Sequence, residues 1–175
     1  MKNLSEYINE SLVVEKLSLD DIVIYKPKTK DELKSLIDKL IKERGLDANL
    51  NDIDTSLITD MSELFMNSKF NGDISRWDVS RVDDMFCMFA ESQFNGDISR
   101  WDVSSVTNMY SMFENSQFNG DISRWDVGKV VDMSFMFYNS KFNQNIDRWN
   151  VSRVKSMKDM FEACPLENDP PKWYK

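Results

Sequence analysis

The sequence of 175 residues contains no histidine. This absence removes the commonest general base and the commonest metal ligand of proteins. It also excludes every catalytic arrangement that pairs serine or cysteine with histidine. Only two cysteines are present, Cys87 and Cys164. They lie about three repeats apart in the pattern described below, which is too far for a disulfide in a regular stack, so both are expected to be free thiols.

Basic residues and long apolar runs are also scarce. Lys and Arg number 22 against 30 Asp and Glu, giving a formal net charge of −8. This balance argues against a nucleic-acid partner, because binding phosphates requires clustered basic residues. No apolar run approaches ~18 residues, so no membrane insertion is expected. The first residues carry an early acid and no apolar core, so the sequence predicts no secretory signal and a cytoplasmic location.

What the sequence does contain is a repeat. Phe-Asn-Gly-Asp-Ile-Ser-Arg-Trp-Asp-Val begins at Phe70, recurs unchanged at Phe94 and Phe118, and returns in altered form at Phe142. The period is 24 residues. A fixed period of this size indicates supersecondary units that stack and bury their apolar sides against each other. Four full units, with a half unit at each end, place a repeat array at residues 51–175.

One half of each unit carries a helical pattern. Val82, Met85, Met88 and Phe89 recur at a spacing that predicts one face of a short helix, with Ser80 as its N-cap. The helical spacing predicts that the methionine columns are buried. The first column comprises Met85, Met109, Met133 and Met157, and the second comprises Met88, Met112, Met136 and Met160.

The other half predicts a strand. From Ile74 to Val79, β-branched and aromatic residues alternate with polar ones, as in a half-buried strand. Asn71 and Gly72 precede it and tolerate positive φ, so they are expected to form a turn. The tryptophans of this half are expected to serve mainly in packing. The predicted fold class is therefore α/β: a solenoid of 24-residue helix–turn–strand units.

A separate segment precedes the array. Asp21 to Tyr25 reads as a strand, and Thr29 with Glu32 forms a capping box ahead of an amphipathic helix that ends at Gly45. Residues 21–50 are thus predicted to be a strand–helix cap that shields the apolar end of the array. Residues 1–20 are expected to form a flexible leader.

The repeats resemble the BspA-like leucine-rich-repeat family, whose units also occur in mycoplasma lipoproteins. The matching signature is Asp-Ile-Ser-x-Trp-Asp-Val-Ser-x-Val-x-x-Met-x-x-Met-Phe-x-x-Ser-x-Phe-Asn, from Asp97 to Asn119. The resemblance covers about Ile53 to Trp173. It implies an α/β solenoid and a role in adhesion or partner binding.

The leader carries a second resemblance. Met-Lys-x-x-x-Glu-Tyr-Ile-x-Glu is similar to the capsid-targeting leader of T-even phage internal proteins, which a head protease cuts after Glu. The resemblance implies processing between Glu10 and Ser11, and a place in the phage virion. The alternative is a frayed terminus that packs lightly on the cap.

Two sets of residues are candidates for binding. The first is an Arg/Asp strip on the strand side, which forms either a salt-bridge ladder between units or a docking surface. It comprises Arg76, Asp78, Arg100, Asp102, Arg124, Asp126 and Arg148. The second is a set of aromatics at positions that vary between units, which are either interface anchors or partly buried spacers. It comprises Phe86, Tyr110, Phe135 and Tyr138. The Arg/Asp strip is the favoured docking surface, because stacked strands align repeated side chains.

These features favour a non-enzymatic, monomeric module that binds a protein partner and needs no cofactor. The alternatives are a phage head-packaged protein that engages a host factor and a surface adhesin. An enzyme using carboxylates such as Asp102 and Glu114 is disfavoured, because regular repetition builds no unique pocket. No metal is expected either, since each Asn-Gly-Asp loop offers one carboxylate and calcium takes ~6–8 oxygen ligands.

Overall fold

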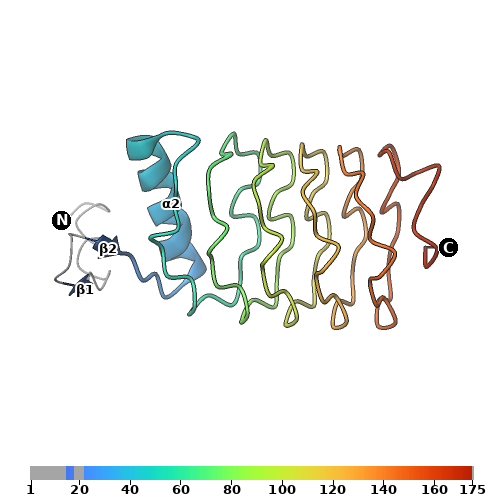
Figure 1. Ribbon diagram of the computed structural model, residues 1–175, viewed down its shortest axis with the longest axis horizontal. Coiled ribbons are helices and arrows are strands. Elements are labelled where there is room, and N and C mark those ends of the chain that lie inside the picture. The colour runs from blue at the N-terminus through green and yellow to red at the C-terminus, as the bar shows by residue number, and fades with distance from the viewer. Residues whose placement is uncertain (1–14, 18–21, 175) are drawn as a thin grey trace.

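The computed structural model describes residues 15–17 and 22–174. Strand β1 (Glu15–Leu17) pairs antiparallel with β2 (Ile22–Ile24), and helix α2 (Lys30–Arg44) follows. After α2 the chain forms a row of irregular coils stacked along one axis, with α2 at one end and the C-terminus at the other (Figure 1). The predicted leader, with Glu10 and Ser11, lies outside the described residues.

Helix α2 forms where the sequence predicts a helix. The Thr29 hydroxyl accepts the N–H of Glu32 at 3.2 Å, and the Glu32 carboxylate accepts the N–H of Lys28 at 2.7 Å. These reciprocal bonds satisfy donors that would otherwise be unpaired at the helix start. At the other end Gly45 has φ 96°, and its N–H donates to the Ile41 carbonyl. Both helix ends are therefore set by residues that the sequence pattern identifies.

Helix α2 closes the N-terminal end of the row of coils. Its apolar face is fully buried, at Leu33, Leu36, Ile37 and Leu40. The Arg44 guanidinium makes two hydrogen bonds to the Asp52 carboxylate, at 3.0 and 2.7 Å. Such a paired geometry is the stronger form of ion pair. The helix is thus attached to the coils by apolar packing and by a directional charged contact at its C-terminal end.

Each coil consists of two arms joined by corners. The first arms are residues 59–67, 83–91, 107–115, 131–139 and 155–163, and the second arms are residues 70–79, 94–103, 118–127 and 142–151. Along a first arm, the N–H of Met85 donates to the carbonyl of Asn108 in the next coil at 3.0 Å, and this step recurs at every second residue. The N–H groups between them bond within the coil, as from Met88 to Met85 at 3.2 Å. Half of the arm's donors therefore join coils and half close turns.

The predicted α/β solenoid of helix–turn–strand units is wrong. In each first arm, where a helix is predicted, two residues adopt the left-handed conformation, as Cys87 (φ 50°) and Glu91 (φ 57°) do. A right-handed helix does not accommodate such residues. The apolar spacing of Met85, Met88 and Phe89 also fits consecutive turns, whose inward positions coincide with one helical face. Within the described ranges, α2 is the only helix.

The second arms are not strands either. The N–H of Trp77 donates to the Ile74 carbonyl at 3.2 Å, which closes a turn inside the predicted strand. The Asp73 carboxylate accepts the N–H of Ser75 at 2.9 Å. Such local bonds from Asp side chains compete with the bonds between strands. The alternation of apolar and polar residues correctly indicates which side chains point inward, but the backbone that carries them turns.

The Asn-Gly pairs have a different role from the predicted one. Among the glycines with described positions, only Gly45 has positive φ, so Gly72 is not a left-handed turn residue. A Cβ on Gly72 would lie 2.0 Å from the carbonyl oxygen of Ala48 in the preceding half coil. The side chain of Asn71 accepts the N–H of Asn95 at 2.7 Å, and the same bond recurs in the next two coils. The pair thus serves close approach and bonding between coils.

The core runs through the whole row. Met85, Met109 and Met133 are fully buried, as predicted, whereas Met157 in the last first arm is only partly buried. The second methionine column is fully buried along its length. Beside it, phenylalanine rings stack face to face, with Phe89 5.6 Å from Phe113 and nearly parallel to it. One continuous column of sulfur and aromatic side chains therefore fills the interior.

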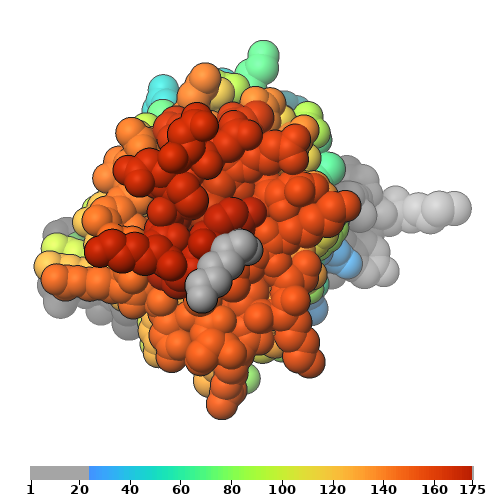
Figure 2. All heavy atoms as spheres, turned by 90° about the vertical axis from the view of Figure 1, so that its right-hand side faces the viewer, coloured from blue at the N-terminus to red at the C-terminus, as the bar shows by residue number. Residues whose placement is uncertain are grey.

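The C-terminal segment covers the other end of the row (Figure 2). Trp173 stacks on Trp149 with ring centroids 6.3 Å apart, and Tyr174 packs edge-on against Phe161 at 4.9 Å. Pro165 stands 24 residues after Lys141, whose N–H donates to the carbonyl of Ser116. Because proline has no N–H, that line of bonds between coils ends there.

Candidate protein-interaction surface

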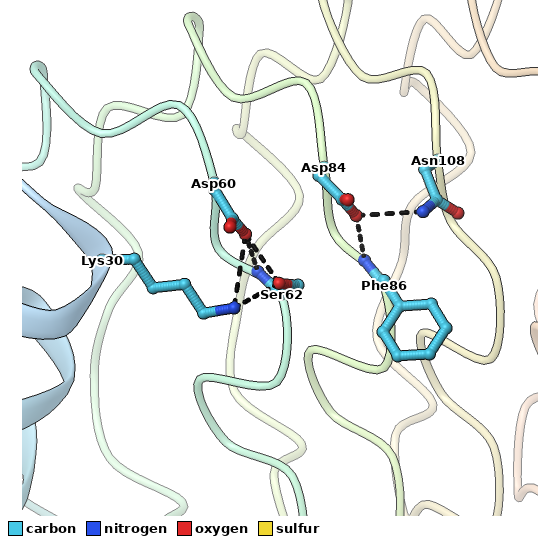
Figure 3. Close-up of polar contacts among 6 residues, drawn as sticks. All are labelled: Lys30, Asp60, Ser62, Asp84, Phe86 and Asn108. Atoms are coloured by element: carbon cyan, nitrogen blue, oxygen red, sulfur yellow. Dashed lines mark hydrogen bonds and ion pairs between the residues drawn. The ribbon is translucent and has the colours of Figure 1, made fainter.

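A column of Asp and Asn residues fixes the outward side chains of the first arms. The Asp84 carboxylate accepts the N–H of Phe86 at 2.8 Å, and the Asn108 side chain accepts the N–H of Tyr110 at 3.0 Å. The Asn108 amide also donates to Asp84 at 3.1 Å, which links the two coils (Figure 3). Such turns hold the residue two positions on in a set orientation. Phe86 and Tyr110 are therefore presented from a rigid backbone.

Four aromatic rings form a continuous strip on this surface, which we call the aromatic strip. Phe86 stacks on Tyr110 with centroids 5.4 Å apart. Tyr110 meets Phe135 edge-on at 5.6 Å, and Phe135 meets Tyr138 edge-on at 5.9 Å. All four side chains are half-buried. The rings thus shield each other in part, yet each leaves a face or an edge in solvent.

The aromatic strip borders a shallow hollow of about 430 Å³ with a mostly apolar lining. The lining residues are Phe86, Thr107, Asn108, Tyr110, Val131 and Asp132. Val131 is 36 % exposed, and Met66 on the outer side of the first arm at residues 59–67 is 40 % exposed. Large apolar side chains that remain in solvent together mark surfaces used for contact.

Carboxylates surround the same surface. Burial raises the pKa of the Cys87 thiol to about 11, and the nearby charges of Glu114, Glu63 and Asp84 raise it further. The Ser111 hydrogen bond acts in the opposite direction. At neutral pH the thiol is protonated and a poor nucleophile. Cys87 therefore reports an acidic environment and is not a reactive group.

The Arg/Asp strip does not form the expected salt-bridge ladder. Its arginines are exposed, and within the part of the chain that the structure describes no ion pair joins them to Asp78, Asp102 or Asp126. Each of these carboxylates accepts a backbone N–H two residues on, as Asp78 does from Ser80 at 3.0 Å. The hollow between Arg76 and Arg100 has a mostly polar lining. The charged side chains of this strip are thus engaged locally or solvated.

The carboxylates considered for catalysis are separated by the fold. Asp102 lies in a second arm and Glu114 in a first arm. Hydrogen bonds from Ser104 lower the pKa of Asp102, with Lys129 adding to the effect. A carboxyl held in its ionised form is poorly suited to donate a proton. Asp102 is better described as the acceptor that closes its own turn.

No group of three or more Cys, Asp and Glu side chains suited to a metal ion occurs among residues 15–17 and 22–174. Over the same ranges, no helix has the length and apolarity required to cross a bilayer.

The Asp/Asn column was missed by sequence reasoning. Its signal was available, because Asp60, Asp84, Asn108 and Asp132 follow at 24-residue steps, each two positions before an outward residue. Its first member also receives a cation, since Lys30 of α2 lies 3.6 Å from Asp60 and bonds Ser62 (Figure 3). The column therefore joins the helix to the coils as well as orienting the surface.

One protein family, described as "Mycoplasma protein of unknown function, DUF285", matches residues 32–139 and 88–174. The match covers the helix and every coil. It includes none of the leader, so it gives the phage resemblance no support. No curated protein matches the chain, and no solved structure does.

Proposed function

Because the chain belongs to the DUF285 family of mycoplasma proteins, whose function is unknown, we propose a function from the surface itself: it is a non-enzymatic module that binds a protein partner on the aromatic strip. The observation that carries the proposal is the unbroken sequence of ring contacts from Phe86 to Tyr138 on the outside of three coils. Clustered aromatic side chains are the commonest energetic anchors of protein interfaces.

Stacking of the coils does not require these rings. Ser62, Ser134 and Lys158 occupy the positions equivalent to Phe86 and Tyr110 in the other first arms. The coils at those positions stack through the same backbone bonds. A residue type that the fold does not demand is free to serve contact with a partner.

The aromatic strip is better suited to docking than the Arg/Asp strip, which the sequence favours. The hollow beside the aromatic strip is mostly apolar, whereas those beside Arg76 and Arg124 are mostly polar. Exposed charged contacts contribute ~0–1 kcal/mol each, while buried aromatic anchors contribute more. The resemblance to BspA-like repeats agrees with a binding role, and an adhesin is one form that this role takes.

The test uses a photo-cross-linking amino acid at position 110 or, as a control, at position 124 in the second arm. In lysate of the source organism, position 110 is expected to give a discrete adduct. Excess unlabelled protein should compete for it, and excess of the double variant Phe86→Ser, Tyr110→Ser should not. An adduct from position 124 alone, or equal competition by the variant, contradicts the proposal.

A further inference from the structure

The outward surface of the first arms carries charge of one sign. Residues 59–67, 83–91, 107–115 and 131–139 contain seven acidic residues and no Lys or Arg. The acids are Asp60, Glu63, Asp83, Asp84, Glu91, Glu114 and Asp132. The four second arms also contain seven acidic residues, but these are accompanied by Arg76, Arg100, Arg124 and Arg148. The acidic field is therefore concentrated on the side that bears the aromatic strip.

These charges are largely uncompensated. Asp60 is paired with Lys30 of α2. Among the described residues, no cation lies within ion-pairing distance of Asp84, Glu91, Glu114 or Asp132. Like charges held on one rigid surface raise the local negative potential and favour a cationic partner.

The chain itself supplies an example of the contact that this surface accepts. In the last first arm, Lys158 occupies the position equivalent to Phe86 and Tyr110. Its ammonium lies 5.5 Å from the centre of the Phe135 ring. A cation over an aromatic face is attracted by the electron density of the ring. One end of the aromatic strip is thus already covered by a lysine.

We propose that the partner docks a basic, extended segment along the aromatic strip, with apolar side chains on the rings and Lys or Arg side chains reaching the flanking carboxylates. This inference rests on the proposed function and names the chemistry of its partner. The first arms lie about 4.8 Å apart, as in stacked strands, so an extended segment crossing them meets a ring or a carboxylate in each coil.

Two matched variants separate charge from aromatic contact. The first neutralises four carboxylates on the aromatic side: Asp84→Asn, Glu91→Gln, Glu114→Gln and Asp132→Asn. The turns should survive, because Asn108 already performs in its coil the role that Asp84 performs in the preceding one. The control neutralises four second-arm carboxylates: Asp97→Asn, Asp102→Asn, Asp121→Asn and Asp126→Asn. Asn145 and Asn150 naturally occupy those columns and accept the same bonds.

The experiment selects binders from a displayed library of random 12-residue peptides on the full chain and measures the strongest by fluorescence anisotropy. The enriched peptides are expected to carry net positive charge together with apolar residues. Four lost charge contacts should weaken binding about tenfold in the first variant, and the control should bind almost as the unmodified protein does. Binding should also weaken as salt rises.

The outcomes distinguish the two proposals. If the selected peptides are neutral or acidic but still lose affinity on Phe86→Ser, Tyr110→Ser, the aromatic strip binds and the inference of a basic partner is wrong. If no peptide depends on the two rings, or none is enriched, both proposals fail. If both four-charge variants weaken binding equally, net charge rather than this surface is responsible, and the inference is again wrong.

Discussion

The indole Nε1 of Trp101 donates a hydrogen bond to the carbonyl oxygen of Ile74, 3.2 Å away in the preceding coil. Every tryptophan of the array makes this bond, always to a residue 27 positions earlier. The four inner indoles are nearly inaccessible to solvent. Each tryptophan therefore both fills the core and ties its coil to the one before, which explains why the residue recurs without variation.

Replacing Trp101 with Phe should lower the free energy of unfolding by about 1–3 kcal/mol, because the buried carbonyl of Ile74 loses its donor while most apolar contact remains. Urea unfolding followed by circular dichroism measures the change. The control is Trp173→Phe, whose indole bonds Ile146 at the partly exposed C-terminal end. An equal loss in the two variants would show that packing, not the bond, dominates.

Replacing Met109 with Ala should cost ~2–5 kcal/mol, since the side chain is fully buried and the interior is densely packed. Met157→Ala should cost clearly less, because Met157 is only partly buried. The same urea titration compares them. An unchanged midpoint for Met109→Ala would contradict its place in the core.

The sequence predicts the inside of this molecule better than its backbone. The 24-residue period, the inward methionines and the caps of α2 follow from spacing and residue type alone. The conformation of the coils does not. Met85, Met88 and Phe89 occupy the same inward positions in a helix and in consecutive turns, and only backbone bonds to the next coil decide between them. Those bonds reach across 23 residues or more, beyond any local propensity.

Gly72→Ala should destabilise the protein by at least ~1–3 kcal/mol, because the added Cβ would overlap the carbonyl of Ala48, a backbone atom that has little room to move. Gly120→Ala is the matched variant. There the nearest backbone oxygen, that of Gly96, lies 3.6 Å from the added Cβ, and the tighter contact is with the Phe118 ring. Thermal unfolding should rank Gly72→Ala as the more damaging. The reverse order would assign the cost to the ring contact.

The raised pKa of Cys87 predicts a pH dependence in the alkaline range. Below about pH 8.5 the thiol is protonated in both the folded and the unfolded chain and adds no slope. Between there and its folded pKa of about 11, only the unfolded chain loses the proton, so the free energy of unfolding should fall as pH rises. Cys87→Ser should reduce this fall. Equal slopes for the two proteins between pH 8.5 and 10.5 would contradict the prediction.

The candidate surface could be found only in part from the sequence. Phe86 and Tyr110 were identified because they vary where the repeat does not demand them. Their contacts with Phe135 and Tyr138 depend on the left-handed conformation of Phe135, at φ 58°, which no residue type announces. The Arg/Asp strip looked stronger because alternating charges suggest pairing. In the folded chain those carboxylates bond their own backbone.

Pro165 gives the array a defined last row, and the 24-residue period means that each inner row brings its own complete set of donors and acceptors. Insertion or removal of one such unit, at any point between α2 and Pro165, leaves every remaining bond with its partner. Gene duplication can therefore lengthen the molecule without redesigning it. The reach of its outer surface along a partner is set by how many copies of one short stretch of DNA the gene carries.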